Sequence, residues 1–236
     1  MPDHIVKAYD LDISALKTLL ATMGGWAEEQ LDNAITALSK HDIALADQVI
    51  AGDDRLDVLE REIEEKAILT IAKRQPMALD LREIMVAIRV SSDIERIGDL
   101  AKNTAKRTHA VSEILPRRLS TGLARMGNMA QAQLKNVLDA YARRDDAAAM
   151  QVWRSDEDLD ALYNSIFREL LTYMMEDPRN ISLCTHLLFG AKNLERIGDH
   201  TTNIAENIHY LIHGKTITEG RPKKDVTAMM NPERDA

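Results

Sequence analysis

The pentapeptide Glu95-Arg96-Ile97-Gly98-Asp99 occurs a second time in this chain as Glu195-Arg196-Ile197-Gly198-Asp199, at an offset of 100 residues. The residues beyond it also agree at this offset, since Asn103 is matched by Asn203. An identical phrase that returns after a domain-sized interval indicates an internal duplication of the chain. We therefore expect two related halves with one copy of the phrase in each.

The phrase has the spacing of an α-helix, because Glu95 and Asp99 are four residues apart and so share one helix face. Apolar residues precede both copies on that face at steps of three and four. They are Leu81, Ile84 and Ile88 in the first half and Ile181, Cys184 and Leu188 in the second. The carboxylate side chains therefore project from the packed face of the helix or from its edge. Carboxylates are rare there unless a cation or a metal ion compensates their charge.

The composition predicts an all-α protein. Hydrophobic residues make up 45% of the 236 residues, aromatic residues only 4%, and there are 10 glycines and 6 prolines. The remainder is rich in good helix formers such as alanine, leucine, glutamate and arginine. A formal net charge of −8 argues against a nucleic-acid-binding surface, which is normally basic, and suits a protein that attracts cations.

The chain carries no signal that directs it to a membrane or to an oxidising compartment. Cys184 is its one cysteine, so an intrachain disulfide is excluded. The first residues contain no basic region followed by an apolar core, as a secretory signal would. No apolar stretch reaches the roughly 18 residues that a spanning helix requires. We expect a cytoplasmic protein without membrane insertion.

Helical periodicity and breakers predict six long helices in two sets of three. The expected helices cover residues 4–39, 42–74, 80–109, 119–143, 145–176, and the stretch from about 181 to Gly214, with breaks at Pro76, Pro116 and Pro178. Gly24-Gly25 is expected to kink the first helix, and residues 52–54 to distort the second. Helices of this length joined by short turns form antiparallel bundles.

The predicted fold is thus two tandem, related three-helix bundles. We expect the first over residues 1–112 and the second over residues 113–214. Residues 215–236 lack periodicity and large apolar side chains, so they are expected to form a flexible tail.

Acidic pairs on two helices of each bundle predict metal sites. The second helix of each set carries aspartates four residues apart, and an antiparallel arrangement brings them to the same end as the phrase. The candidate ligands are Asp53, Asp57, Glu95 and Asp99 in the first bundle and Asp156, Asp160, Glu195, Asp199, Asn203 and Glu206 in the second. Oxygen ligands suit divalent or trivalent ions such as Mg, Mn, Ca or Fe.

Two features of the sequence bear on these predicted sites. Arg96 and Arg196 lie beside the glutamates and offer the alternative that the carboxylates are held in ion pairs without a metal. Glu206 of the second half corresponds to Lys106 of the first. Since an ammonium group repels a cation that a carboxylate attracts, the second site is expected to bind metal more strongly.

A carboxylate-bridged di-metal enzyme or metal-storage protein is the competing interpretation. Such bundles use two Glu-x-x-His pairs, whereas this chain has one, at Glu206 and His209. His209 and His213 are four residues apart and could bind metal, but their place near a helix end favours solvated side chains. Cys184 lies on an apolar stripe and is expected to be a buried, inert thiol.

Longer stretches of the sequence resemble the PhoU family of phosphate-transport accessory and regulatory proteins. The resemblance spans nearly the full length of the chain. It is carried by residues 74–76 and 80–82, both copies of the repeated phrase, and residues 167–181, 192–200 and 202–206.

The resemblance implies two three-helix bundles, a cytoplasmic location, frequent homodimers and a regulator rather than an enzyme. It implies negative regulation of phosphate uptake and of the phosphate-starvation response. The implied partners are the phosphate-sensing histidine kinase and the ATPase subunit of the phosphate ABC transporter. It also implies metal binding at the acidic pairs named above.

Overall fold

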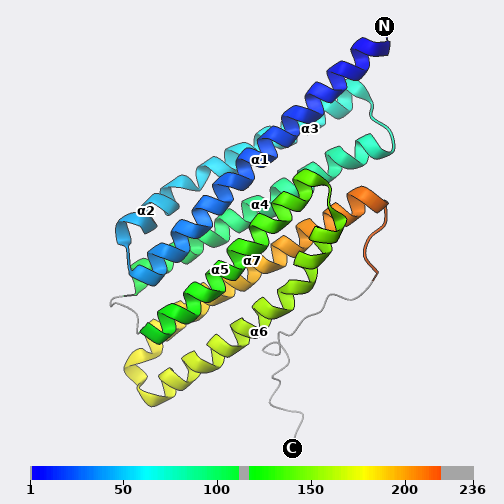
Figure 1. Ribbon diagram of the computed structural model, residues 1–236. Helices are drawn as coiled ribbons and strands as arrows, with labels where there is room; N and C mark the ends of the chain where they lie inside the picture. The colour runs from blue at the N-terminus through cyan, green and yellow to red at the C-terminus, as the bar shows by residue number, and fades with distance from the viewer. Residues whose placement is uncertain (1, 112–116, 219–236) are drawn as a thin grey trace, which may run out of the picture.

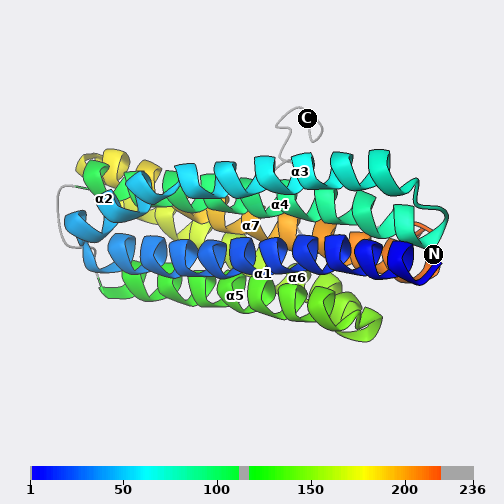
Figure 2. The ribbon, with the colours of Figure 1, turned by 90° about the horizontal axis from the view of Figure 1, so that it is seen from above.

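The computed structural model describes residues 2–111 and 117–218, and it is all-helical in this part of the chain. The helices are α1 (Pro2–Lys40), α2 (Ile43–Gly52), α3 (Asp54–Arg74), α4 (Leu79–Ala110), α5 (Arg117–Arg143), α6 (Asp146–Glu176), the short 3₁₀ helix η1 (Pro178–Asn180) and α7 (Ile181–His213). They form two antiparallel three-helix bundles that lie side by side along one long axis (Figures 1 and 2). The predicted fold class is confirmed.

The same turn begins the second helix of each bundle. His41 and Arg144 both have positive φ angles, of 56° and 52°. The next residue in each case is an aspartate that caps the helix: Asp42 accepts a hydrogen bond from the Leu45 amide and Asp145 from the Ala148 amide, both at 3.0 Å. Side-chain acceptors of this kind satisfy amides that the first turn of a helix leaves free. The duplication therefore includes the turns as well as the helices.

Two glycine-containing stretches behave differently from each other. The distortion expected at residues 52–54 is present, since α2 ends at Gly52 and α3 begins at Asp54. The sharp kink expected at Gly24-Gly25 is not seen: α1 runs as one helix through both residues, without a sharp bend in either view (Figures 1 and 2). Gly24 instead allows α1 and α5 to lie close together, because a Cβ there would lie 2.9 Å from the Leu138 side chain of α5.

The two bundles meet through a reciprocal contact between α1 and α5. Gly24 of α1 faces Leu138, while Gly127 of α5 faces Ile35, where a Cβ would lie 2.6 Å from the isoleucine. Gly24 and Gly127 are 103 residues apart in the sequence, and so are Ile35 and Leu138. The contact therefore has the self-complementary form of a two-fold interface. α4 and α7 also pack against each other, and the buried apolar side chains of both bundles form one continuous core.

The C-terminal segment leaves α7 at Gly214, which has a left-handed φ of 71°. Residues 215–218 follow it, and Ile217 is partly buried against the core. The rest of the expected tail lies outside the described residues. None of the described helices combines the length and the apolar character needed to cross a membrane.

Candidate metal sites

The first acidic cluster already contains a cation. Asp53, at the junction of α2 and α3, is buried and accepts a hydrogen bond from the Lys102 ammonium of α4. Lys102 Nζ also lies 3.9 Å from Asp99 Oδ1. The hydrogen bond to Asp53 raises the pKa of Lys102. Burial raises the pKa of Asp53, and Lys102 opposes this shift. The lysine therefore compensates charge where a metal ion would have to bind.

Arg96 supplies a second cation to this cluster. Ion pairs with this arginine were the alternative to a metal ion that the sequence offered. Its Nε lies 3.4 Å from Glu95 Oε2 and its Nη1 3.6 Å from Asp99 Oδ2. Burial raises the pKa of Glu95, Arg96 lowers it, and the nearby Asp99, Glu60 and Asp57 raise it further. The first repeat thus brings its predicted carboxylates into one neighbourhood together with two basic side chains.

The second acidic cluster is more deeply buried. Asp156, Asp160 and Glu195 are only 1%, 3% and 4% exposed. Lys192 Nζ lies 2.9 Å from Glu195 Oε1, whereas Glu195 Oε2 is buried without a hydrogen-bond partner in the described structure. Burial raises the pKa of Glu195, Lys192 lowers it, and Asp199 and Asp160 raise it. A buried carboxylate oxygen of this kind suits a cation.

The position of Lys102 is occupied in the second repeat by a neutral residue. Thr202 corresponds to it at the offset of 100 residues, and its hydroxyl donates to the Asp199 carbonyl at 2.7 Å. Arg196 is exposed, as is the equivalent Arg96 of the first repeat. The second cluster has its own ion pair between Lys192 and Glu195, but because the buried Glu195 Oε2 has no hydrogen-bond partner in the described structure, this cluster fits a metal ion better than the first.

Gly198 of the repeated phrase allows the close packing of the second cluster. A Cβ at this position would collide with the Asp156 carboxylate and with Leu159, and would lie 3.2 Å from the Gln133 amide oxygen. In the first repeat the equivalent Gly98 faces Leu56. The glycine of each phrase is thus required by the side chains of the neighbouring helix.

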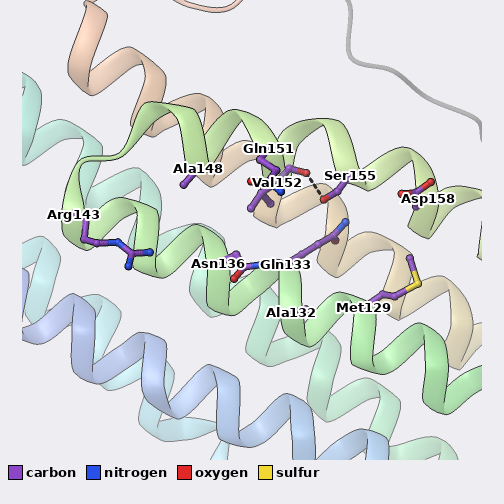
Figure 3. A pocket seen from close by; sticks show the side chains of 10 residues that line it. All are labelled: Met129, Ala132, Gln133, Asn136, Arg143, Ala148, Gln151, Val152, Ser155 and Asp158. Carbon is purple, nitrogen blue, oxygen red and sulfur yellow. Dashed lines mark hydrogen bonds between the residues drawn. The ribbon is translucent and has the colours of Figure 1, made fainter.

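Gln133 connects this cluster to a pocket of about 540 Å³ between α5 and α6 (Figure 3). The pocket is lined on the α5 side by Gln133 and Asn136 and on the α6 side by Val152, Ser155 and Asp158. Ser155 donates a hydrogen bond to the Val152 carbonyl at 2.9 Å. Gln133 lies both in the pocket wall and near Asp156. Its side chain therefore lies between the solvent in the pocket and the buried carboxylates.

The two remaining predicted ligands make other contacts. Asn203 donates to Asp93 Oδ1 of the first repeat at 3.3 Å, and Glu206 Oε1 accepts from the Trp153 indole at 3.0 Å. Lys106, which the sequence comparison set against Glu206, is exposed. The cation that distinguishes the first repeat is therefore Lys102, one helical turn earlier.

In the described residues, no three of the predicted carboxylates have oxygens within 4.8 Å of one another, so their role as a metal site stays a prediction. One other group meets this spacing: Asp146, His209 and His213. The sequence singled out the two histidines but predicted that they would be solvated, and it missed Asp146. The four-residue spacing of His209 and His213, which puts both on one helix face, was the sequence signal for this group.

A family model for the PhoU domain matches the chain twice, over residues 20–108 and 123–208. The chain belongs to the PhoU family. The two matches fall in the two bundles and include the two copies of the repeated phrase.

Several relatives extend over nearly the whole chain. The phosphate-specific transport system accessory protein PhoU homolog of Rhizobium meliloti is 54% identical over 233 residues, 98% of each chain. The PhoU protein of Escherichia coli is 39% identical over 90% of this chain and 88% of its own. The crystal structure of PhoU from Pseudomonas aeruginosa covers 88% of this chain and 100% of its own with a TM-score of 0.85 at 38% identity.

Family membership decides between the two classes of function that the sequence left open. PhoU proteins are accessory and regulatory proteins, not enzymes. The sequence agrees, since it has a single Glu-x-x-His pair, Glu206 and His209, whereas di-metal bundle enzymes use two.

Proposed function

We propose that this protein is a negative regulator of phosphate uptake and of the phosphate-starvation response. It acts in the cytoplasm as a homodimer, by contact with the ATPase subunit of the phosphate ABC transporter and with the phosphate-sensing histidine kinase. The observation that carries the proposal is the 54% identity, over 98% of both chains, to a phosphate-specific transport system accessory protein.

The name of a second relative supports the regulatory part of this proposal. A phosphate transport system regulatory protein PhoU from Streptococcus pneumoniae covers 89% of this chain and 100% of its own with a TM-score of 0.83 at 26% identity. The two elongated bundles also offer long helical faces for protein contact (Figure 1). Exposed apolar side chains lie on those faces, among them Ile68, Leu69 and Phe189.

We further propose that the second repeat holds a divalent or trivalent metal ion. Asp156, Asp160, Glu195 and Asp199 would supply oxygen ligands, and the ion would offset the cost of burying them. The proposal is supported by the buried Glu195 Oε2, which has no hydrogen-bond partner in the described structure. The first repeat, with Asp53, Asp57, Glu95 and Asp99, would bind metal more weakly because Lys102 and Arg96 compensate its charge.

The contact with partners is tested by capture on the purified full chain. The ATPase subunit and the cytoplasmic part of the kinase are each passed over the immobilised protein, with an unrelated acidic helical bundle as control. We expect both to be retained by this protein and neither by the control. Retention of neither partner at micromolar concentrations would overturn the contact mechanism.

A further inference from the structure

A cluster of one carboxylate and two imidazoles joins the start of α6 to the end of α7, apart from both acidic clusters. Asp146 Oδ1 lies 2.9 Å from His209 Nδ1, and Asp146 Oδ2 lies 3.0 Å from His213 Nε2. The centroids of the two imidazole rings are 4.5 Å apart, and the rings are tilted by 40° to each other. All three potential ligand atoms lie within 4.8 Å of one another.

The helices fix this arrangement. His209 and His213 are four residues apart on α7, so they project from one face toward the first turn of α6. Asp145 caps α6 and thereby places the following Asp146 in that turn. The three side chains are partly exposed, at 30% for Asp146, 24% for His209 and 46% for His213, so solvent ions reach them.

The spacing and the ligand types suit a transition metal. Zinc binds histidine nitrogen and carboxylate oxygen at about 2.0–2.2 Å, which places neighbouring ligands of a tetrahedral ion roughly 3.3–3.6 Å apart. The observed N–O separations of 2.9 and 3.0 Å need only a small opening to admit an ion. Imidazole ligands favour Zn, Cu, Ni or Fe over Mg and Ca.

We propose that Asp146, His209 and His213 form a binding site for a divalent transition-metal ion such as Zn²⁺, distinct from the oxygen-only clusters of the two repeats. The three protein ligands leave at least one coordination position open. Asp146 and His209 line a pocket of about 830 Å³ together with residues 214–218. Arg154 and Lys215 in the pocket wall are exposed, so solvent screens their repulsion of the ion.

The consequence is a metal-dependent anchor for the end of α7. An ion at this position would tie the last turn of α7 to the first turn of α6, beside the segment that begins at Gly214. The first repeat has the pair His109–Asp47, with Nε2 2.9 Å from Oδ1, but within the described residues no third ligand joins it. The proposed site is thus a property of the second repeat.

The test is a titration of the chelator-treated full chain with Co²⁺, followed by visible absorption. Co²⁺ with histidine ligands at low coordination number absorbs much more strongly than Co²⁺ bound only by oxygen in octahedral geometry. We expect wild-type protein to show strong bands that saturate at one ion per chain and that excess Mg²⁺ does not displace. We expect His209→Gln/His213→Gln, and separately Asp146→Asn, to lower the apparent Co²⁺ affinity at least about tenfold.

Two matched variants serve as controls. His109→Gln removes the analogous histidine of the first repeat, and Asp199→Asn changes the oxygen-only cluster; both should keep the strong bands. Circular dichroism checks that each variant folds. Strong bands that persist unchanged in both the double variant and Asp146→Asn would overturn the proposal, as would their absence from wild-type protein. The three residues would then be a hydrogen-bonded helix-end contact only.

Discussion

At the scale of single residues, the repeated phrase is explained by contact rather than by helix propensity. Gly198 lies in mid-helix, where glycine costs about 0.5–1 kcal/mol relative to alanine. A Cβ there would meet Asp156 and Leu159, so we expect Gly198→Ala to lower the free energy of unfolding by about 1–3 kcal/mol through overpacking. Urea denaturation measures this loss.

Gly25→Ala is the matched control for this substitution. Gly25 is also helical, but no atom lies within 4 Å of a Cβ built there. We expect a gain of up to about 1 kcal/mol from helix propensity. A stabilising effect of both substitutions would show that Gly198 is not needed for the approach of α6 to α7.

The buried carboxylate of Glu195 should make stability depend on pH. Its folded-state pKa lies above the unfolded value of about 4.3, chiefly because it is buried. Ionisation therefore costs folding free energy above the folded pKa, and this cost disappears as the pH falls below the unfolded pKa. In chelator-treated protein, Glu195→Gln should be more stable than wild type by about 1 kcal/mol at pH 7. The difference should vanish near pH 4; a difference that does not change with pH would contradict this origin.

At the scale of elements, Lys102 holds the α2–α3 junction against α4. Its side chain is 25% exposed and that of Asp53 only 5%, so removing the lysine leaves a buried, uncompensated carboxylate. We expect Lys102→Ala to cost about 2–4 kcal/mol of unfolding free energy, as loss of one partner of a buried ion pair does. In the double variant Asp53→Asn/Lys102→Met most of this loss should be recovered. Equal losses in the single and double variants would argue against an ion-pair role.

The elements also show how far sequence patterns reach. Apolar periodicity and proline positions predicted every long helix, because these signals are local. The close approach of α1 to α5 at Gly24 was not predictable, since it involves Leu138, which lies more than a hundred residues away. The sequence also placed the distinguishing cation of the first repeat at Lys106 instead of Lys102. Both residues lie near one helix face, and only the packing of α3 against α4 decides which ammonium reaches Asp53.

The candidate sites show the same division between local and distant signals. The acidic pairs and the two histidines were visible because residues four apart on a helix share a face. Asp146 was not recognised, because nothing in the sequence reveals that the start of α6 meets the end of α7. The burial of Glu195 likewise depends on packing between helices.

At the scale of the whole molecule, the two repeats are expected to differ in metal binding although they share one ancestral pattern. Titration of an oxygen-preferring ion such as Mn²⁺ should show tighter binding to Asp99→Asn than to Asp199→Asn, because the second cluster holds the ion. The loss in Asp199→Asn should be at least tenfold, since one carboxylate ligand near an ion contributes more than about 1.4 kcal/mol at an effective dielectric of 20.

A gain-of-function variant complements this titration. Lys102→Thr copies Thr202 into the first repeat and should increase metal binding there. Equal metal loss in Asp99→Asn and Asp199→Asn, or no loss in either, would show that the asymmetry does not exist.

The proposed regulatory role is tested most directly in cells that have ample phosphate. The measurement is expression of a reporter from a phosphate-starvation promoter in the parent strain, in a strain lacking this gene, and in that strain complemented with the wild-type gene. We expect high expression in the deletion strain despite ample phosphate, and repression restored by the wild-type copy. Reporter expression that stays low and unchanged after deletion would contradict the role of this protein as a negative regulator of the phosphate-starvation response.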